Sequence, residues 1–301
     1  MTSINLSNID TGNVTNFSNT FYGCSGLTSL NVSTFDTAKS TTFAGMFQGC
    51  SNLTSLDLSD FDTSKATTLA NMFYGCTKLA EIDGIEDFDT SLVTTLASMF
   101  YNCSSLTELD LSSWNTPKLT TLSSTFYGCS KLEELDISNF DTSKVTTMDS
   151  LFYNASKLSS LNLSSFSTES VTTISSMFNG MTSLKSILLP STYNFNGKGA
   201  ITGTNRAILP TPTSPATGWK RVYNSITGRK VSDSAVYSAA DLRDDWDAST
   251  MAGLWVWDTE TISSSGFGDS TSYESINSKW QRLQADTWTY TFDVFDPQLT
   301  Y

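Results

Sequence analysis

Hydrophobic residues recur along most of the chain with a nearly constant period. The five cysteines are separated by 26, 26, 27 and 26 residues and lie at Cys24, Cys50, Cys76, Cys103 and Cys129. A Phe precedes each cysteine by three residues, a Leu follows it by three, and the spacing continues to Ala155 and Met181. Such self-similarity is typical of repeat proteins, in which each unit buries its apolar face against its neighbours. We therefore predict a stack of seven repeats, ending near Leu189.

Each repeat contains a strand signature. The segment Leu53–Ser59 fits the L-x-x-L-x-L pattern of leucine-rich repeats. Because side chains alternate across a strand, Leu56 and Leu58 are expected inside and Asp57 outside. The sequence predicts that these strands pair in parallel from one repeat to the next.

The second half of each repeat has a helical pattern. Leu69, Met72 and Phe73 are spaced i, i+3 and i+4, which predicts one face of a short helix. Paired threonines are expected to cap its start, and Gly75 to end it. The predicted fold is an α/β repeat solenoid of the leucine-rich-repeat type, with a parallel sheet and short outer helices. A small β-rich or mixed C-terminal module is expected to follow it.

The repeat motif resembles the BspA-like leucine-rich-repeat surface proteins of bacteria. The closest segments are Leu58–Ser64 and Met72–Cys76, and the likeness extends from Ile4 to Leu189. Residues Leu209–Trp257 are similar to the segment that follows such repeats in surface proteins of Gram-positive bacteria. The resemblance implies a protein that faces the outside of the cell and serves adhesion or display rather than catalysis.

The chain departs from that family in its targeting signals. The first twenty residues hold no Lys, no Arg and no apolar run, so no secretory signal is expected, and no C-terminal sorting motif is present. Two explanations remain open: the chain is an excised fragment, or it reaches the outside by another route, such as assembly into a virus particle. The expected location is extracellular, on a cell surface or in a virion.

Composition changes after Leu189. All five arginines and six of the seven tryptophans lie beyond residue 200. We expect a repeat domain over residues 1–189, a cap and Pro/Thr/Ser linker over 190–218, and a Trp-rich module over 219–301. Within that module the sequence predicts a helix start at Ser238–Leu242 and strands at Leu254–Trp257 and Trp288–Val294.

Charge and composition exclude several classes of function. The net charge of −13 argues against contacts with nucleic-acid phosphates, and no run of 18 apolar residues is available to enter a membrane. Histidine is absent, which removes Ser-His-Asp and Cys-His hydrolases and histidine-ligated zinc. The odd number of cysteines, replaced by Ala155 and Met181 in later repeats, favours small buried thiols over disulfides or metal ligands. We expect no catalytic residues and no cofactor.

The outward strand positions carry two acidic columns. They comprise Asp57, Asp83, Asp110 and Asp136, with Glu81, Glu108 and Glu134 beside them. Like charges about 5 Å apart repel by about 0.8 kcal/mol even in water, so we expect raised pKa values and a stability that increases as the pH falls. The columns either keep the repeats soluble or bind a cation such as calcium or a basic partner. A glycosidase is disfavoured because no loop interrupts the repeats to enclose a cleft.

Two sets of aromatic residues are further candidates. Tyr22, Tyr74, Tyr101, Tyr127 and Tyr153 form a column that is expected to be half-exposed, either covering the joints between helices or stacking on sugars. The candidate docking residues of the C-terminal module are Trp219, Trp246, Trp255, Trp257, Trp280 and Trp288.

Two functions follow from these patterns. The first is a non-enzymatic recognition or adhesion module that binds a protein or glycan on a cell surface. The second is a structural protein of a virion or appendage, docked to other virion proteins through its tryptophans. Association into a homo-oligomer is compatible with both functions.

Overall fold

The computed structural model describes residues 2–195, 207–214, 216, 218–224, 229–230, 235–244 and 246–257. The repeats contribute short strands, which are β1 (Ser55–Asp57), β2 (Glu81–Asp83), β3 (Glu108–Asp110), β4 (Glu134–Asp136), β5 (Ser160–Asn162) and β6 (Ser186–Leu189). The C-terminal part contributes β7 (Trp219–Asn224), β8 (Arg229–Lys230), α1 (Ala239–Asp244), α2 (Ala248–Met251) and β9 (Gly253–Trp257).

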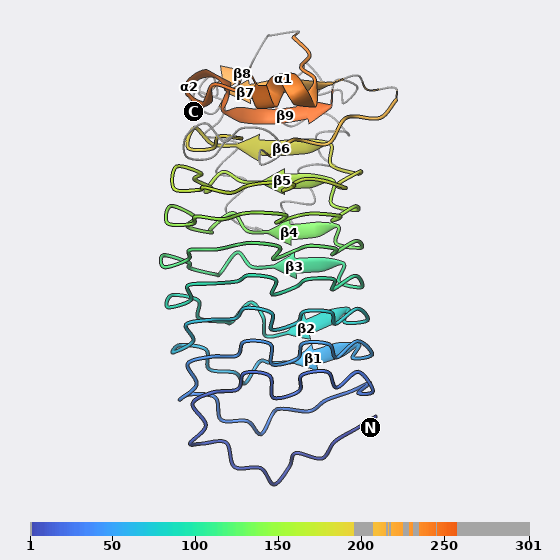
Figure 1. The fold of residues 1–301 in the computed structure, drawn as a ribbon, viewed down its shortest axis with the longest axis vertical. Helices are drawn as coiled ribbons and strands as arrows, with labels where there is room; N and C mark the ends of the chain where they lie inside the picture. Colours follow the sequence, from blue (N-terminus) through green and yellow to red (C-terminus); the bar gives the residue numbers. More distant parts are fainter. Residues whose placement is uncertain are drawn as a thin grey trace, which may run out of the picture.

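Successive repeats lie on one another along the long axis of the molecule (Figure 1). Strand β1 pairs with β2, β3 with β4, and β5 with β6, and all three pairs are parallel and in register. A second parallel ladder joins six repeats through Thr42, Thr68, Thr95, Thr121, Thr147 and Thr173. The predicted parallel pairing of neighbouring repeats is confirmed.

The predicted outer helices of the repeats are wrong. Residues 70–75 form turns instead, and Asn71 and Gly75 both have left-handed backbones, with φ of 59° and 71°. The backbone N–H groups of Asn71, Phe73 and Gly75 donate to carbonyl oxygens of the next repeat at 2.9, 2.9 and 2.7 Å. An α-helix needs these donors for bonds within itself. Every second N–H of the segment therefore donates to the next repeat, and no helix can form.

The paired threonines do not cap helices either. The hydroxyl of the first threonine donates to the backbone carbonyl of its equivalent in the preceding repeat, for example Thr67 to Thr41 at 3.1 Å and Thr94 to Thr67 at 3.0 Å. The second threonine of each pair forms the backbone ladder described above. These residues thus bind repeats together along a second edge of the stack.

The core consists of columns of identical side chains. The phenylalanine three residues before each cysteine stacks on its equivalents, with ring centroids 5.7 Å apart for Phe47 and Phe73 and 5.5 Å for Phe73 and Phe100. Both Phe73 and Phe100 are fully buried, as are Leu53 and Leu79. Burying a large apolar side chain contributes about 1.5–3 kcal/mol, so these columns dominate the stability of the stack.

One repeat contains an extra residue. Cys76 and Cys103 are 27 residues apart, and the insertion is Gly84, which directly follows β2 and has a φ of +75°. A Cβ atom at Gly84 would overlap the backbone of Ser59, so only glycine fits there. Ile85 takes the buried position that Leu58 holds in the preceding repeat. Strands β2 and β3, on either side of this bulge, belong to different sheets.

The C-terminal strands extend the last sheet of the repeats. Strand β9 pairs antiparallel with β6, and β7 pairs antiparallel with β9, giving the order β5-β6-β9-β7-β8. The apolar run Leu254–Trp257 is therefore a strand, as predicted, while residues 288–294 lie outside the described part. The change from parallel to antiparallel pairing ends the series of repeats at this face.

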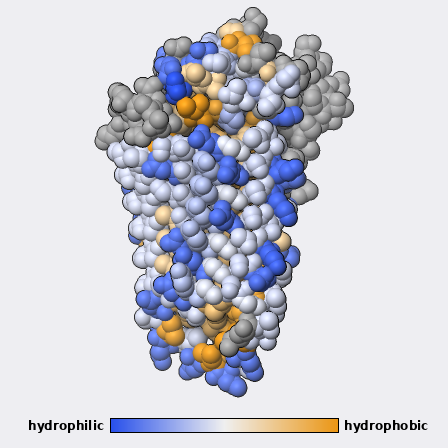
Figure 2. Space-filling model, turned by 45° about the vertical axis from the view of Figure 1, so that its right-hand side comes forward, coloured by the Kyte–Doolittle hydropathy of each residue, from blue (hydrophilic) through white to orange (hydrophobic). Residues whose placement is uncertain are grey.

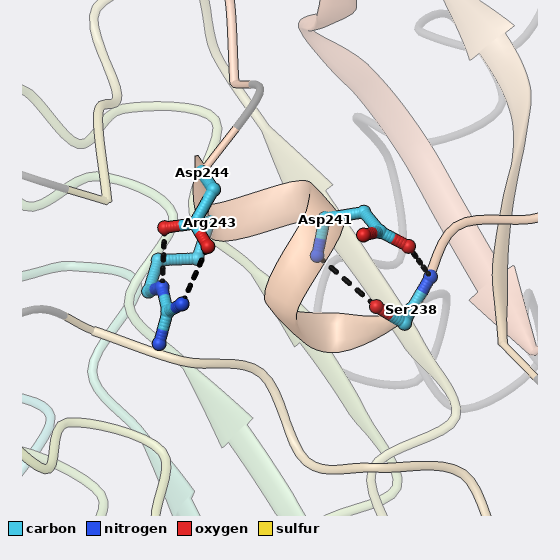
Figure 3. Close-up of polar contacts among 4 residues, drawn as sticks. All are labelled: Ser238, Asp241, Arg243 and Asp244. Atoms are coloured by element: carbon cyan, nitrogen blue, oxygen red, sulfur yellow. Dashed lines mark hydrogen bonds and ion pairs between the residues drawn. The ribbon is translucent and has the colours of Figure 1, made fainter.

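The predicted helix start at Ser238 is confirmed. Ser238 Oγ accepts a hydrogen bond from the Asp241 N–H at 3.1 Å, and an Asp241 carboxylate oxygen accepts one from the Ser238 N–H at 3.0 Å (Figure 3). This reciprocal pair satisfies donors at the start of α1, and Arg243 pairs with Asp244 at its end. Neither α1 nor α2, the helices of the described residues, has the length and hydropathy of a membrane span.

The surface along the repeats is mostly hydrophilic, and apolar atoms gather near the two ends of the stack (Figure 2). At the N-terminal end Ile4 and Ile9 are 40% and 47% exposed. They occupy the register of Leu30 and Phe35, which are buried in the following repeat. The repeats therefore expose hydrophilic side faces to solvent, and apolar residues are exposed mainly at the ends of the stack.

Candidate functional site

The strands place the predicted acidic residues on one face. Asp57 pairs in register with Asp83, Glu108 with Glu134, and Asp110 with Asp136. Glu81, Asp83, Glu108 and Asp110 are exposed, whereas Glu134 is half-buried and Asp136 is buried. The structure thus brings the residues of both acidic columns together, with the exposed carboxylates on the first three strands.

Local turns hold several of these carboxylates. Asp57 accepts hydrogen bonds from the N–H and hydroxyl of Ser59 at 3.1 and 2.6 Å. Asp110 has the same arrangement with Ser112, and Asp136 with Ser138. The hydrogen bonds from Ser59 hold the pKa of Asp57 below its usual value. The expectation of a raised pKa is therefore wrong for Asp57, because the hydrogen bonds from Ser59 outweigh desolvation.

The acidic face contains a hollow of about 770 Å³ between β2 and β3. It is lined by Ala80, Glu81, Ile82, Asp83, Ile85, Glu86, Thr107, Glu108, Leu109 and Asp110. Five of these ten residues are carboxylates, and no Lys or Arg is among them. The hollow lies next to the Gly84 bulge. The strand face is therefore less regular here than the sequence predicts.

A buried tryptophan in the next repeat contacts the segment that follows the bulge. Positions equivalent to Trp114 hold phenylalanine in the neighbouring repeats, at Phe88 and Phe140. The indole N–H of Trp114 donates to the carbonyl oxygen of Ile85 at 2.9 Å, just behind the hollow. Trp114 therefore satisfies a buried acceptor at the repeat in which pairing is interrupted.

The carboxylates do not form a metal centre. Within the described residues, no three Asp, Glu or Cys side chains are arranged so as to hold a metal ion. The hollow offers negative charge over an extended surface, which suits several cationic groups of one partner better than a single ion. The geometry therefore does not support the expectation of a calcium site.

All five cysteines are free, as predicted, and four of them are buried. Each buried thiol donates to the carbonyl of a phenylalanine in the preceding repeat, as Cys76 does to Phe47 at 3.1 Å. Burial raises the pKa of Cys50 to about 11 and that of Cys129 to about 12. These thiols stay protonated and serve packing.

Four of the tyrosines form a continuous stack. The ring centroids are 4.4 Å apart for Tyr74 and Tyr101, 4.4 Å for Tyr101 and Tyr127, and 4.6 Å for Tyr127 and Tyr153, and the rings are nearly parallel. All four are half-buried, whereas Tyr22 is 60% exposed. Because neighbouring rings cover each other's faces, the stack leaves mainly ring edges exposed. This opposes the alternative in which sugars stack on the tyrosines.

Three of the six predicted docking tryptophans are buried, which argues against a docking role for these three. Trp219, Trp246 and Trp255 are buried, with exposures of 0%, 8% and 1%. The indole N–H of Trp246 donates to the Tyr193 carbonyl at 2.7 Å, and the Trp246 ring packs on Phe195 and Trp255. These residues hold the C-terminal strands to the end of the stack. The side chain of Trp257, and both Trp280 and Trp288, lie outside the described part.

Sequence reasoning missed the hollow and the second ladder of threonines. The signal for the hollow was the single spacing of 27 residues between Cys76 and Cys103. The signal for the ladder was the threonine pair itself, since β-branched residues favour strands over helices.

One family model matches most of the repeats. A family model described as "Mycoplasma protein of unknown function, DUF285" matches residues 1–83 and 77–190. A solved structure, that of the leucine-rich-repeat protein TpLRR of T. pallidum, is similar with 17% identity and a TM-score of 0.25. That similarity covers 64% of this chain and 59% of the T. pallidum chain. No curated protein matches the sequence.

Proposed function

This chain belongs to the DUF285 family of mycoplasma proteins of unknown function, and we propose that it is a non-enzymatic binding module displayed outside the cell. In this proposal the repeats form a leucine-rich-repeat solenoid of the BspA-like type and act as a rigid scaffold. The L-x-x-L-x-L strands and the two parallel ladders support this assignment. A scaffold of this kind presents one long face to a macromolecular partner.

The hollow between β2 and β3 carries the proposal. It gathers Glu81, Asp83, Glu86, Glu108 and Asp110 around one concavity. Concave sites with converging polar groups are the usual binding sites of proteins. With no basic residue in the lining, the complementary surface is a lysine- or arginine-rich segment of a partner protein.

An enzymatic role is disfavoured by the exposure of these carboxylates. A glycosidase needs one carboxylic acid whose pKa is raised by burial, opposite a second carboxylate. All five carboxylates of the hollow are exposed to solvent. Carboxylates exposed to water are suited to attracting a cationic partner at long range rather than to transferring a proton.

The alternative role, as a virion component docked through tryptophans, loses its main support. The described candidates Trp219, Trp246 and Trp255 are occupied in holding the C-terminal strands to the repeats. A virion location stays a prediction, without a docking surface assigned to it.

The proposal is tested with an arginine-rich peptide as a model of the partner, by titration calorimetry at low and high salt. We expect binding that weakens as salt rises, and that weakens further in Glu81→Gln. The matched control is Glu169→Gln, which removes the same charge from an exposed residue outside the hollow. Equal affinities for Glu81→Gln and Glu169→Gln would show that only net charge acts, and the hollow would lose its role.

A further inference from the structure

The tyrosine stack, defined as Tyr74, Tyr101, Tyr127 and Tyr153, brings reactive phenols of successive repeats into direct contact. Centroid separations of 4.4, 4.4 and 4.6 Å with interplanar angles of 4°, 7° and 3° place each ring flat against the next. The separations are close to the spacing of neighbouring strands, about 4.8 Å, so the repeat brings the rings into contact.

The hydroxyl groups lie together as well as the rings. The pKa of Tyr101 is raised by burial and then by the neighbouring phenols of Tyr127 and Tyr74. The four side chains are half-buried, so small molecules reach their edges. Tyr22 is excluded from the stack because Gln48 occupies the intervening repeat.

We propose that the tyrosine stack is a site of oxidative cross-linking, at which neighbouring repeats become joined by dityrosine in the presence of a peroxidase and hydrogen peroxide. Each of two adjacent phenols loses one electron and its hydroxyl proton. The two phenoxyl radicals form one carbon–carbon bond between ring positions ortho to the oxygens. The hydrogens on those two carbons leave as protons, and the oxygens are protonated again.

The overall reaction balances with one molecule of peroxide. The two phenols lose two electrons and two protons in total, and hydrogen peroxide accepts them to become two molecules of water. Because the rings already touch, the radicals meet within one molecule and need no encounter between two chains. The product joins residues 27 apart for Tyr74 and Tyr101, and 26 apart for Tyr101 and Tyr127.

Such a bond closes a loop of one repeat. A covalent cross-link of this kind stabilises mainly by restricting the unfolded chain, as a disulfide does. Four of the five free cysteines are buried, whereas the four tyrosines of the stack are partly exposed, so an oxidant reaches the tyrosines more readily. This modification is independent of any partner bound at the strand face.

The test treats the full chain at low concentration with peroxidase and peroxide and maps cross-linked peptides by mass spectrometry. We expect an intramolecular product, two hydrogens lighter, that joins peptides containing adjacent tyrosines of the stack. In the double variant Tyr101→Phe/Tyr153→Phe the rings remain but the surviving phenols, Tyr74 and Tyr127, are two repeats apart. We expect this variant to lose the product and Tyr22→Phe to retain it.

Thermal unfolding measured beforehand confirms that each variant is folded. A wild-type product that joins two molecules, or that maps to tyrosines outside the stack, would overturn the proposal. An undiminished yield in the double variant would do the same.

Discussion

Oδ1 of Asn102 occupies the space in which the Cβ atom of any larger residue at Gly128 would lie. Asn154 has the same relationship to Gly180 in the following pair of repeats. All four residues have left-handed backbones, with φ of 56° and 57° for the asparagines and 70° and 78° for the glycines. A Cβ atom at Gly128 or Gly180 would force the preceding asparagine side chain to move, so an asparagine at this corner favours a glycine in the next repeat.

This relationship predicts the effect of alanine at two glycine positions. Gly128→Ala is expected to lose about 1–2 kcal/mol from the left-handed backbone and a further 1–3 kcal/mol or so from overlap with Asn102. Gly75→Ala shares the backbone strain, with φ of 71°, but has space, because its nearest neighbour is Cα of Gly49 at 3.9 Å. Urea unfolding should show the larger loss for Gly128→Ala, and Asn102→Gly should rescue it. Equal losses without rescue would mean that the overlap is absorbed.

The buried thiols predict a small cost and a clear pattern of reactivity. Cys76→Ala should lower the free energy of unfolding by about 1–2 kcal/mol, since it removes one buried sulfur. Cys24, which is partly exposed, should react first with a thiol reagent in the native protein. After denaturation without a reductant all five should react. Fewer than five would reveal a disulfide.

Acid should destabilise the protein. Burial raises the pKa of Asp149, but hydrogen bonds from Thr173, Ser175 and Thr147 outweigh it and hold the pKa below its usual value. Hydrogen bonds from Ser59 lower that of Asp57. A lowered folded-state pKa contributes stability that is present above the unfolded value of about 4 and is lost as the pH falls through the folded value.

The free energy of unfolding should therefore fall as the pH is lowered below about 4. Asp149→Asn should reduce this slope, because the amide does not titrate. The direction is opposite to that expected from repulsion between the acidic columns. A protein that grows more stable as the pH falls below about 4 would restore that expectation.

The periodic pattern predicted the columns of the core correctly, since a buried position is buried in every repeat. It failed for the predicted helices. Leu69, Met72 and Phe73 are buried as expected, but the backbone that carries them is not helical. Asn71 takes a left-handed conformation between them, and every second N–H joins the next repeat. An i, i+3, i+4 pattern cannot distinguish this path from a helix, because both place the same side chains inside.

The candidate site was predicted only in part. The alternation of side chains along the strands placed Glu81, Asp83, Glu108 and Asp110 on one face. The hollow lies next to Gly84, an insertion of one residue between β2 and β3 whose effect on the surface the repeat pattern does not predict. Composition alone points to the tryptophans as docking residues, and composition does not distinguish an exposed tryptophan from a buried one such as Trp255.

Deleting Gly84 tests most directly whether the hollow is the binding site. The deletion restores the 26-residue spacing and removes the bulge beside the hollow, while every carboxylate of the lining is retained. Affinity for the arginine-rich peptide is measured alongside thermal unfolding, which reports whether the variant is folded. The account predicts a folded protein that binds the peptide markedly more weakly than the wild type. A folded variant with unchanged affinity would contradict it.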